Sequence, residues 1–315
     1  MEFQILLDCV LVIISVIMLW KGADWLVDSA AEIAHSFKVS DLIIGLTVVA
    51  FGTSAPEFAV TISAAFTNQT DISIGNVIGS NIFNLGFILG GTAIIRPIAV
   101  SQKLFNRDGL FLLMSTALIF ILFFGINGWD INDSFTQMEG FILFSMLIGY
   151  IIFLFIKKDP PEEVHPSTAT KSSYLFFLIG LILIVSGGHL MVEHASNVAR
   201  FIGISDWVIA VTIVAAGTSA PEFATSISAA LKGRHGIAVG NLIGSDLFNL
   251  LGVLGLAGII NPSSISQDIY SSTFVLVLMV GLTLLMMRTF WRISRIEGII
   301  LVSINLIRWY YDLSP

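Results

Sequence analysis

The segment Gly52–Ala59, with the letters GTSAPEFA, occurs a second time without change at Gly217–Ala224. Each copy follows an apolar run, LIIGLTVVAF before the first and WVIAVTIVAA before the second. Each copy therefore places a carboxylate, two hydroxyls and a helix-breaking proline at the depth of a membrane. A charged side chain at the centre of a bilayer costs about 2.5–3.5 kcal/mol even on lenient insertion scales. Two such charges in identical segments indicate a functional site.

The composition favours a membrane protein. Apolar residues make up 56% of the chain and charged residues 12%, whereas about 25% of the residues of a soluble protein are charged. The single cysteine, Cys9, lies in an apolar segment, so neither a disulfide framework nor a thiolate metal site is expected. The N-terminal segment carries no basic residue before its apolar run, and we interpret it as a first membrane helix and not a cleaved signal peptide.

Ten windows of the sequence are apolar enough to cross a bilayer, for which about 20 residues are needed. They predict an all-α polytopic membrane protein. The second, third, seventh and eighth windows are rich in glycine and polar residues, as is typical of helices in the interior of a bundle. The approximate windows are 4–30, 41–66, 72–95, 106–126, 137–156, 174–198, 206–231, 237–260, 270–287 and 297–313.

The two halves of the chain superimpose after a shift of 165 residues, which places Glu57 on Glu222 and Pro97 on Pro262. Five windows in each half is an odd number, so the second half must enter the membrane from the opposite side. Such inverted repeats are typical of secondary transporters, whose sites lie near the midplane where the repeats meet. The predicted organisation is a first five-helix repeat at 1–156, a linker at 157–173 and a second five-helix repeat at 174–315, with the most similar segments at 41–95 and 206–260.

Basic residues predict the orientation of the chain. Of the 15 lysines and arginines, 13 lie in or beside the linker and the connections that follow the odd-numbered windows, although Lys21 falls within the first window, and only Arg200 and Arg308 lie on the opposite side. Loops rich in basic residues remain in the cytoplasm. We therefore expect both termini outside the cell and the linker 157–173 in the cytoplasm.

A second motif follows the first in each half, GNVIGSNIFN at 75–84 and GNLIGSDLFN at 240–249. Ser80 and Asn84 are four residues apart and share a helix face, as do Ser245 and Asn249. The prolines of the first motif have no N–H, so carbonyls near Ala50 to Thr53 and near Ala215 to Thr218 are expected to be free to face a cavity. Carboxylate, hydroxyl, amide and carbonyl oxygens suit hard cations, namely Ca²⁺ and Na⁺, with Mg²⁺ and Mn²⁺ left open.

The twin motifs resemble the two alpha-repeats of the sodium/calcium exchanger family, in the calcium:cation antiporter superfamily. The resemblance covers essentially the whole chain. The proton-coupled branch typically has a GN-A-x-E pattern in place of GTSxPE, which favours the sodium-coupled branch here. The short linker resembles the minimal prokaryotic form, so the resemblance implies an antiporter of the prokaryotic plasma (inner) membrane that exchanges Na⁺ for Ca²⁺ by alternating access, and not an enzyme.

The resemblance also implies roles for individual residues. Two glutamates would be the shared central ligands, two threonines would bind both ions, four serines and two alanine carbonyls would complete flanking Na⁺ sites, and two asparagines would close the centre. In that order these are Glu57, Glu222, Thr53, Thr218, Ser54, Ser219, Ser80, Ser245, Ala50, Ala215, Asn84 and Asn249. The expected partners are Ca²⁺, Na⁺ and the lipid bilayer, with H⁺ or Mn²⁺ as competing ions. No resident cofactor, nucleic acid or obligate protein partner is expected.

One position departs from part of the family. Some relatives, including the potassium-dependent branch, have Asp where this chain has Asn249, and Asn weakens an argument for K⁺ transport. Asp246 lies roughly 100° further around the helix, and its counterpart Asn81 favours a peripheral or supporting role. An H⁺/Ca²⁺ or other divalent-cation antiporter of the same fold remains an alternative, as does, from a different class, a passive cation channel or a structural membrane protein.

Overall fold

The computed structural model describes residues 2–124, 134–157, 169–204, 213 and 215–313. The described chain is almost entirely helical, with π-helical segments (η) inside several of the long helices and four strands of two residues each. In chain order the helical segments are α1 (Glu2–Ser36), α2 (Asp41–Ile44), η1 (Gly45–Val49), α3 (Ala50–Thr53), α4 (Ala55–Phe66), α5 (Thr70–Phe83), η2 (Asn84–Leu89), α6 (Gly90–Ile95), η3 (Leu104–Gly109), α7 (Leu110–Phe124), α8 (Gln137–Lys157), α9 (Lys171–Phe201), α11 (Ala215–Thr218), α12 (Ala220–Leu231), α13 (His235–Leu247), η5 (Phe248–Val253), α14 (Leu254–Ile260), α15 (Gln267–Arg288) and α16 (Arg295–Leu313).

The predicted membrane protein is confirmed by these helices. Seven of them are long and apolar enough to cross a membrane, and the segment 41–66, which is bent by 52°, makes an eighth. Of the two other predicted windows, 206–231 lies partly outside the described residues. The last window is helical as α16, but this helix also carries charged residues, among them Glu297 and Arg308. Most of the predicted linker 157–173 lies outside the described residues.

Local sequence signals explain where several helices begin and end. The side chain of Ser40 accepts a hydrogen bond of 3.3 Å from the Ile43 amide and caps the start of α2. Helices α6 and α14 end at equivalent places in the two halves, directly before Arg96-Pro97 and Asn261-Pro262. Both residues before the prolines are extended, because a following proline disfavours the helical conformation.

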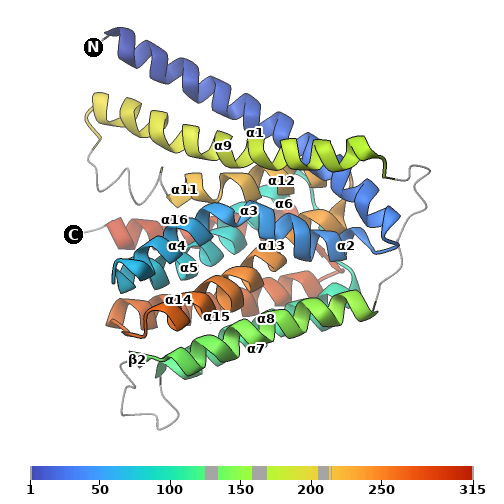
Figure 1. The fold of residues 1–315 in the computed structure, drawn as a ribbon, viewed down its shortest axis with the longest axis vertical. Helices are drawn as coiled ribbons and strands as arrows, with labels where there is room; N and C mark the ends of the chain where they lie inside the picture. Colours follow the sequence, from blue (N-terminus) through green and yellow to red (C-terminus); the bar gives the residue numbers. More distant parts are fainter. Residues whose placement is uncertain (1, 125–133, 158–168, 205–212, 214, 314–315) are drawn as a thin grey trace.

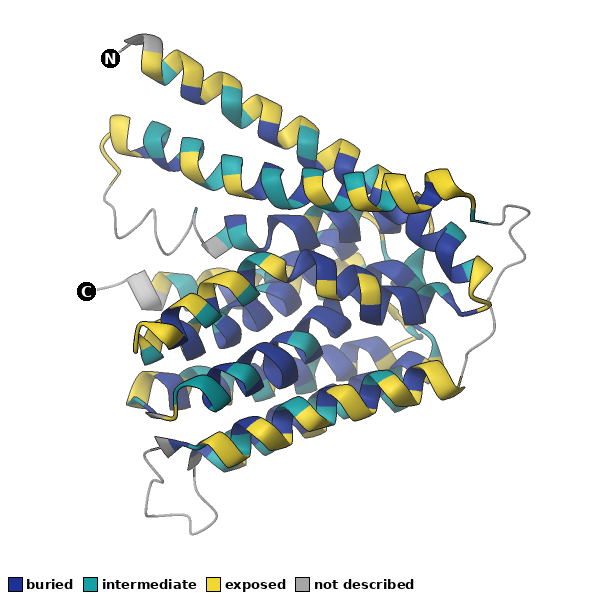
Figure 2. Ribbon diagram, in the orientation of Figure 1, coloured by how far each residue is buried: buried dark blue, intermediate teal, exposed yellow. Residues whose placement is uncertain are grey.

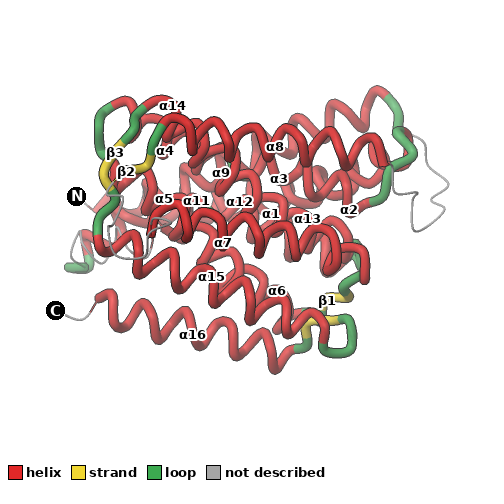
Figure 3. Tube along the Cα trace, turned by 90° about the horizontal axis from the view of Figure 1, so that it is seen from below, coloured by secondary structure: helices red, strands yellow, loops and turns green. Residues whose placement is uncertain are grey.

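The two halves are interwoven in a symmetric way. Helix α8 packs on α14, and its equivalent α16 packs on α6, while the equivalent helices α7 and α15 pack on each other. Strand β1 (Ile98–Ala99) pairs with β4 (Arg292–Ile293), and β2 (Ser134–Phe135) pairs with β3 (Ser263–Ser264), so each ribbon joins one half to the other. The two ribbons lie at opposite ends of the bundle (Figure 3). Both termini lie at one end of the bundle (Figure 1), which agrees with the ten windows predicted from the sequence.

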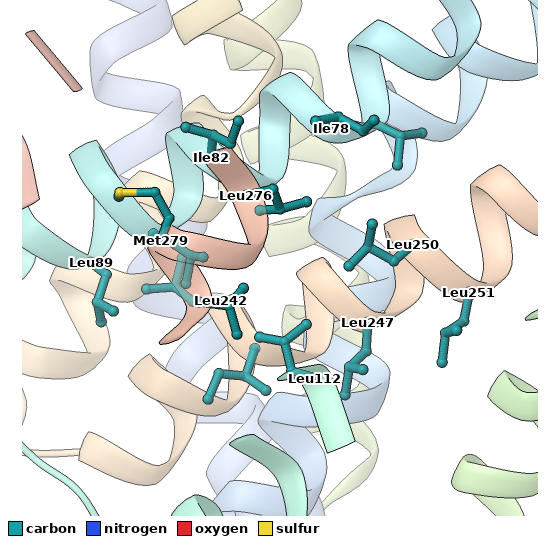
Figure 4. Close-up of a cluster of buried hydrophobic side chains, with 14 of the residues drawn as sticks. Ile78, Ile82, Leu89, Leu112, Leu242, Leu247, Leu250, Leu251, Leu276 and Met279 are labelled. Atoms are coloured by element: carbon teal, nitrogen blue, oxygen red, sulfur yellow. The ribbon is translucent and has the colours of Figure 1, made fainter. Parts of the chain in front are cut away.

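Helices α5 and α13 lie in the interior and are largely buried (Figure 2). One face of these two helices is apolar and packs against α7 and α15, where Ile78, Leu242, Leu276 and Met279 form part of a continuous cluster (Figure 4). The other face carries the polar residues of the second motif and meets α4 and α12. The interior pair thus supplies both the packing core and a polar surface at membrane depth.

Helices α1 and α9 form a long pair at the edge of the bundle (Figure 1). They approach closely where Gly22 meets Gly180, since a Cβ built on either glycine would lie 2.8 Å from the carbonyl oxygen of the other. Small residues at such a crossing allow close backbone contact within a membrane. The exposed sides of both helices are rich in apolar residues, as expected for lipid-facing surfaces.

Candidate cation-binding site

The helix that carries the first motif is broken at the motif itself. Ser54 leaves the helical conformation, with ψ at 9°, and separates α3 from α4, where Pro56 occupies the first turn. Ser219 does the same between α11 and α12, also with ψ at 9°. Each glutamate thereby lies in the first turn of a new helix, at the positive end of the helix dipole. The break therefore turns a serine and a glutamate of each half toward the interior.

Hydrogen bonds cross between the halves at this break. Ser54 Oγ donates to Glu222 Oε1 at 3.1 Å, and Ser219 Oγ donates to Glu57 Oε1 at 2.9 Å. Glu57 is 1% exposed and Glu222 is 0% exposed. The structure thus brings together the two glutamates and two serines that the sequence singled out.

The threonines of the first motif face the serines of the second motif in the opposite half. Thr53 Oγ1 lies 3.4 Å from Ser245 Oγ and donates to Asn241 Oδ1 at 3.0 Å. In the equivalent place, Thr218 and Ser80 line the same small cavity. Two hydroxyl-rich sites therefore flank the pair of glutamates.

Five buried oxygen atoms around this site have no hydrogen-bond partner among the residues that the structure describes. They are Glu57 Oε2, Glu222 Oε2, Asn84 Oδ1, Asn249 Oδ1 and Asp246 Oδ2. A buried polar atom without a partner costs about 1–3 kcal/mol, and more when it carries charge. All five atoms are hydrogen-bond acceptors, so a positively charged guest would satisfy them. Within the described ranges no three His, Cys, Asp or Glu side chains are placed to hold a metal ion, so such a guest would also depend on neutral oxygens.

Asn76 and Asn241 brace the broken helices. Asn76 Nδ2 donates to the Glu57 carbonyl at 3.3 Å and to Thr61 Oγ1 at 2.9 Å. Asn241 Nδ2 lies 3.5 Å from the Glu222 carbonyl and donates to Ser226 at 3.2 Å. Thr61 and Ser226 were not predicted as part of the site, although each follows a glutamate by four residues and so shares its helix face.

Free carbonyls were expected near Ala50 to Thr53, but the carbonyl oxygen of Ala50 already has donors. This oxygen accepts the Ser54 amide at 3.0 Å and lies 3.3 Å from the Thr53 hydroxyl. Proline removes the bond to the carbonyl four residues earlier, which for Pro56 is Gly52. Ala215, the equivalent of Ala50, begins α11, and the residue before it lies outside the described residues.

Of the two roles expected for Asp246, the peripheral one is wrong and the supporting one fits its position. Asp246 is fully buried, and its Oδ1 atom accepts a 3.0 Å hydrogen bond from Asn84. The counterpart residue Asn81 accepts a 3.3 Å bond from Asn249. Asn84 and Asn249 thus each contact the other half, through the pair Asp246 and Asn81, which was not predicted as part of the site.

A cavity of about 150 Å³ lies beside Ser80 and Thr218 of this site. It lies between α5 and α16, and Gly75 and Gly79 form part of its wall, where an added Cβ would meet no atom within 4 Å. The equivalent glycines of the other half are closed off, because a Cβ on Gly240 or Gly244 would lie 2.8 or 2.6 Å from a carbonyl oxygen of Leu42 or Leu46. The two halves are therefore similar in sequence but differ in how open they are.

Comparison with known proteins adds the following similarities. The sequence matches the family model for the sodium/calcium exchanger protein over residues 8–156 and 172–310. Sodium/calcium exchanger MaX1 of Methanosarcina acetivorans is 32% identical over 337 residues, covering 95% of this chain and 96% of the relative. Inner membrane protein YrbG of Escherichia coli is 32% identical over 291 residues, covering 88% and 87%. The structure of the sodium-calcium exchanger NCX_Mj soaked with zero Na⁺ and Ca²⁺ superimposes with a TM-score of 0.84 at 33% identity, covering 96% of this chain and 98% of the other.

Proposed function

The chain belongs to the sodium/calcium exchanger family, so it is an integral membrane cation/Ca²⁺ exchanger and not an enzyme, and we propose that it exchanges Na⁺ for Ca²⁺. MaX1 and NCX_Mj, both described as sodium/calcium exchangers, are similar to it over almost the whole chain. A sequence identity of 32–33% to these relatives does not determine which ion is exchanged for Ca²⁺. That ion is therefore inferred from the residues of the site.

The observation that carries the proposal is the reciprocal pairing of Ser54 with Glu222 and of Ser219 with Glu57, which leaves one buried oxygen of each glutamate without a partner. Two carboxylates balance the charge of one Ca²⁺. Ca²⁺ takes about 6–8 oxygen ligands in flexible geometry. The proposed Ca²⁺ ligands are the carboxylates of Glu57 and Glu222 and the carbonyls of Thr53 and Thr218, with Asn84 and Asn249 closing the centre.

Na⁺ is proposed to use the same region in smaller sites. Thr53, Ser54 and Ser245 would form one flanking site with the Ala50 carbonyl, once the Thr53 hydroxyl turns away from that carbonyl. Thr218, Ser219 and Ser80 would form the other with the Ala215 carbonyl. Because both ions need the two glutamates, Ca²⁺ and the full set of Na⁺ ions exclude each other, and the chain can carry only one kind of cargo at a time.

Alternating access follows from the same electrostatics. Without a cation, two buried carboxylates repel each other, which disfavours closing the site on both sides. A loaded site removes this repulsion and allows the cavity beside Ser80 and Thr218 to close while its equivalent opens. Movement of α1 and α9 against the other helices is proposed to accompany this change.

The orientation and the domain limits remain part of the proposal. We expect two five-helix repeats at 1–156 and 174–315, both termini outside the cell, and a cytoplasmic linker at 157–173. The asymmetry of basic residues supports this orientation. The relative YrbG is described as an inner membrane protein, which supports a location in the prokaryotic plasma membrane.

The proposal is tested by ⁴⁵Ca²⁺ uptake into proteoliposomes that contain the purified chain. Na⁺-loaded vesicles placed in Na⁺-free medium should accumulate ⁴⁵Ca²⁺, and vesicles with equal Na⁺ on both sides should not. Uptake driven by a pH gradient and indifferent to Na⁺ would select H⁺/Ca²⁺ antiport instead. Uptake without any counter-ion would identify a channel.

A further inference from the structure

Arg308 of α16 lies on the wall of the cavity beside Ser80 and Thr218. It is the only ionisable side chain among the described residues that line this cavity, and it is half-buried. An arginine keeps its positive charge at any physiological pH. A cation that approaches the candidate site through this cavity therefore passes a positive charge.

The sequence makes this position unusual. Arg308 and Arg200 are the two basic residues on the side of the chain that the pattern of basic residues assigns to the outside. Arg200 is exposed on α9 and donates to Asn197 at 3.3 Å, whereas Arg308 lines a cavity. Of these two arginines, only Arg308 lies where its charge can act on a cation in the cavity.

The equivalent position in the other half carries no charge. Gly140 of α8 and Gly298 of α16 each pack against a glycine of the opposite half, since a Cβ on either would lie 2.6 Å from the carbonyl oxygen of that glycine. Ten residues after these equivalent glycines stand Tyr150 and Arg308. Tyr150 is buried and donates to Asp108 at 2.7 Å. The positive charge is therefore a feature of one half only.

Neighbouring residues of α16 hold Arg308 at the cavity. The ring of Trp309 packs on Phe87, with 4.8 Å between the ring centroids. Asn305 Nδ2, one turn earlier, donates to the Ile82 carbonyl at 3.4 Å. Both contacts attach the last turns of α16 to α5 and η2, so the backbone of Arg308 is fixed beside the cavity.

The effect of this charge depends on the valence of the ion. At a separation of about 7 Å in water, a unit positive charge lowers the local concentration of a monovalent cation about threefold and that of a divalent cation about eightfold. The second factor is the square of the first, because the electrostatic energy is proportional to the charge of the ion and the concentration depends exponentially on this energy. A cavity of about 150 Å³ keeps an ion close to its wall. The arginine therefore disfavours Ca²⁺ more strongly than Na⁺.

We propose that Arg308 is a specificity-determining residue, whose charge lowers the affinity of the adjacent site for Ca²⁺ more than its affinity for Na⁺. The proposal rests on the Na⁺/Ca²⁺ exchange function and adds a determinant of ion preference to it. A weaker hold on Ca²⁺ at the cavity favours its release there and its replacement by Na⁺. In the proposed orientation the cavity faces the outside, so the charge assists the release of Ca²⁺ from the cell.

The test uses the full chain with two variants that remove the charge and two controls. Arg308→Gln and Arg308→Met replace the arginine by a polar and by an apolar side chain, so one folded variant of the two is sufficient. Arg308→Lys keeps the charge and is the conservative control. Arg200→Gln removes the other arginine of the same side, at an exposed position that does not line the cavity, and is the matched control.

The first measurement is thermal unfolding of the purified protein in detergent, with CaCl₂ or NaCl replacing choline chloride at constant ionic strength. Removal of the charge should lower the concentration for half-maximal stabilisation about eightfold for Ca²⁺ and about threefold for Na⁺. Both controls should stay within about twofold of the parent chain.

Three results of this measurement would overturn the proposal. The first is no shift for either ion in the variants without the charge, which is expected if Arg308 only anchors the end of α16 at the membrane surface. The second is an equal shift for Ca²⁺ and Na⁺, because a charge must act more strongly on the divalent ion. The third is a shift of the same size in Arg308→Lys or in Arg200→Gln.

The second measurement relates the charge to transport. In exchange of internal Ca²⁺ for external ⁴⁵Ca²⁺ without Na⁺, the external Ca²⁺ concentration for half-maximal uptake should fall in Arg308→Gln. External Ca²⁺ should also inhibit Na⁺-driven release of ⁴⁵Ca²⁺ at lower concentrations than in the parent chain. An unchanged Ca²⁺ dependence in both variants without the charge would contradict the proposal. If the parent chain shows no Na⁺-driven release, the exchange function fails, and the unfolding measurement still decides whether Arg308 discriminates between the two ions.

Discussion

Ser54 donates a hydrogen bond of 3.1 Å to Glu222, which lies 168 residues further along the chain. Ser219 and Glu57 repeat this contact at 2.9 Å, so each half holds the glutamate of the other half. Neither copy of the GTSAPE motif forms a binding site alone. The contact between the halves brings chemically equivalent groups of both halves together in one candidate site.

Removal of either glutamate charge should stop transport. Glu57→Gln or Glu222→Gln keeps the shape of the side chain but removes half of the charge available to Ca²⁺. We expect ⁴⁵Ca²⁺ uptake to fall by about a hundredfold or more, since breaking a buried charged interaction costs about 3–5 kcal/mol. Glu193→Gln, at an exposed position of α9, is the control and should leave uptake unchanged. Near-normal uptake in either glutamine variant would remove these glutamates from the site.

The two serines should contribute equally. Ser54→Ala and Ser219→Ala each remove one hydrogen bond to a buried carboxylate, a loss of about 1–3 kcal/mol. We expect each variant to lower the apparent Ca²⁺ affinity by about tenfold, to within a factor of about three of each other. The affinity is read from the Ca²⁺ dependence of uptake. A large effect of one serine and none of the other would contradict the symmetric arrangement.

The difference between the halves in openness gives a prediction about equivalent glycines. Gly79→Ala should leave the free energy of unfolding nearly unchanged, because its new Cβ meets no atom within 4 Å. Gly244→Ala places a Cβ 2.6 Å from the Leu46 carbonyl oxygen and should destabilise the protein by about 1–3 kcal/mol. Thermal unfolding in detergent compares the pair directly.

A larger side chain at the open position should block access. The side chain introduced by Gly79→Leu points into the cavity beside Ser80 and Thr218 and should slow ⁴⁵Ca²⁺ uptake. The melting temperature of this variant should stay close to that of Gly79→Ala. Unimpaired uptake in a folded Gly79→Leu variant would show that ions reach the site by another path.

Acid should inhibit by competition. Protons and cations bind the same carboxylate oxygens, and a carboxylate must be deprotonated to act as a ligand. As the pH falls, the Ca²⁺ concentration for half-maximal uptake should therefore rise, while the maximal rate at saturating Ca²⁺ stays constant. Inhibition that excess Ca²⁺ does not relieve would point to a titrating group away from the site.

The repeat explains why much of the architecture could be predicted. A motif that occurs twice in the same register fixes which residues are equivalent, and an odd number of windows per half requires an inverted copy. Hydrophobic windows placed the helices, although α1 continues to Ser36 and not to residue 30. To predict that Glu57 lies close to Ser219, it was enough to assume that the equivalent helices of the two halves pack against each other.

The details that were not predicted depend on tertiary contacts. The proline rule was applied to the whole turn from Ala50 to Thr53, so the Ala50 carbonyl was expected to be free although Ser54 and Thr53 donate to it. Asp246 was expected in a peripheral or supporting role because its repeat partner is the uncharged Asn81, and the peripheral role does not fit its full burial. The repeat argument transfers roles between equivalent residues, and it fails where the two halves have diverged.

The central claim is that Glu57 and Glu222 together hold one Ca²⁺ that Na⁺ can displace. Equilibrium ⁴⁵Ca²⁺ binding to the purified chain, with increasing Na⁺ at constant ionic strength, tests it most directly. The account predicts one Ca²⁺ per chain at the glutamates, complete displacement by Na⁺, and loss of this binding in both Glu57→Gln and Glu222→Gln. Ca²⁺ binding that persists at high Na⁺, or that survives in either variant, would contradict it.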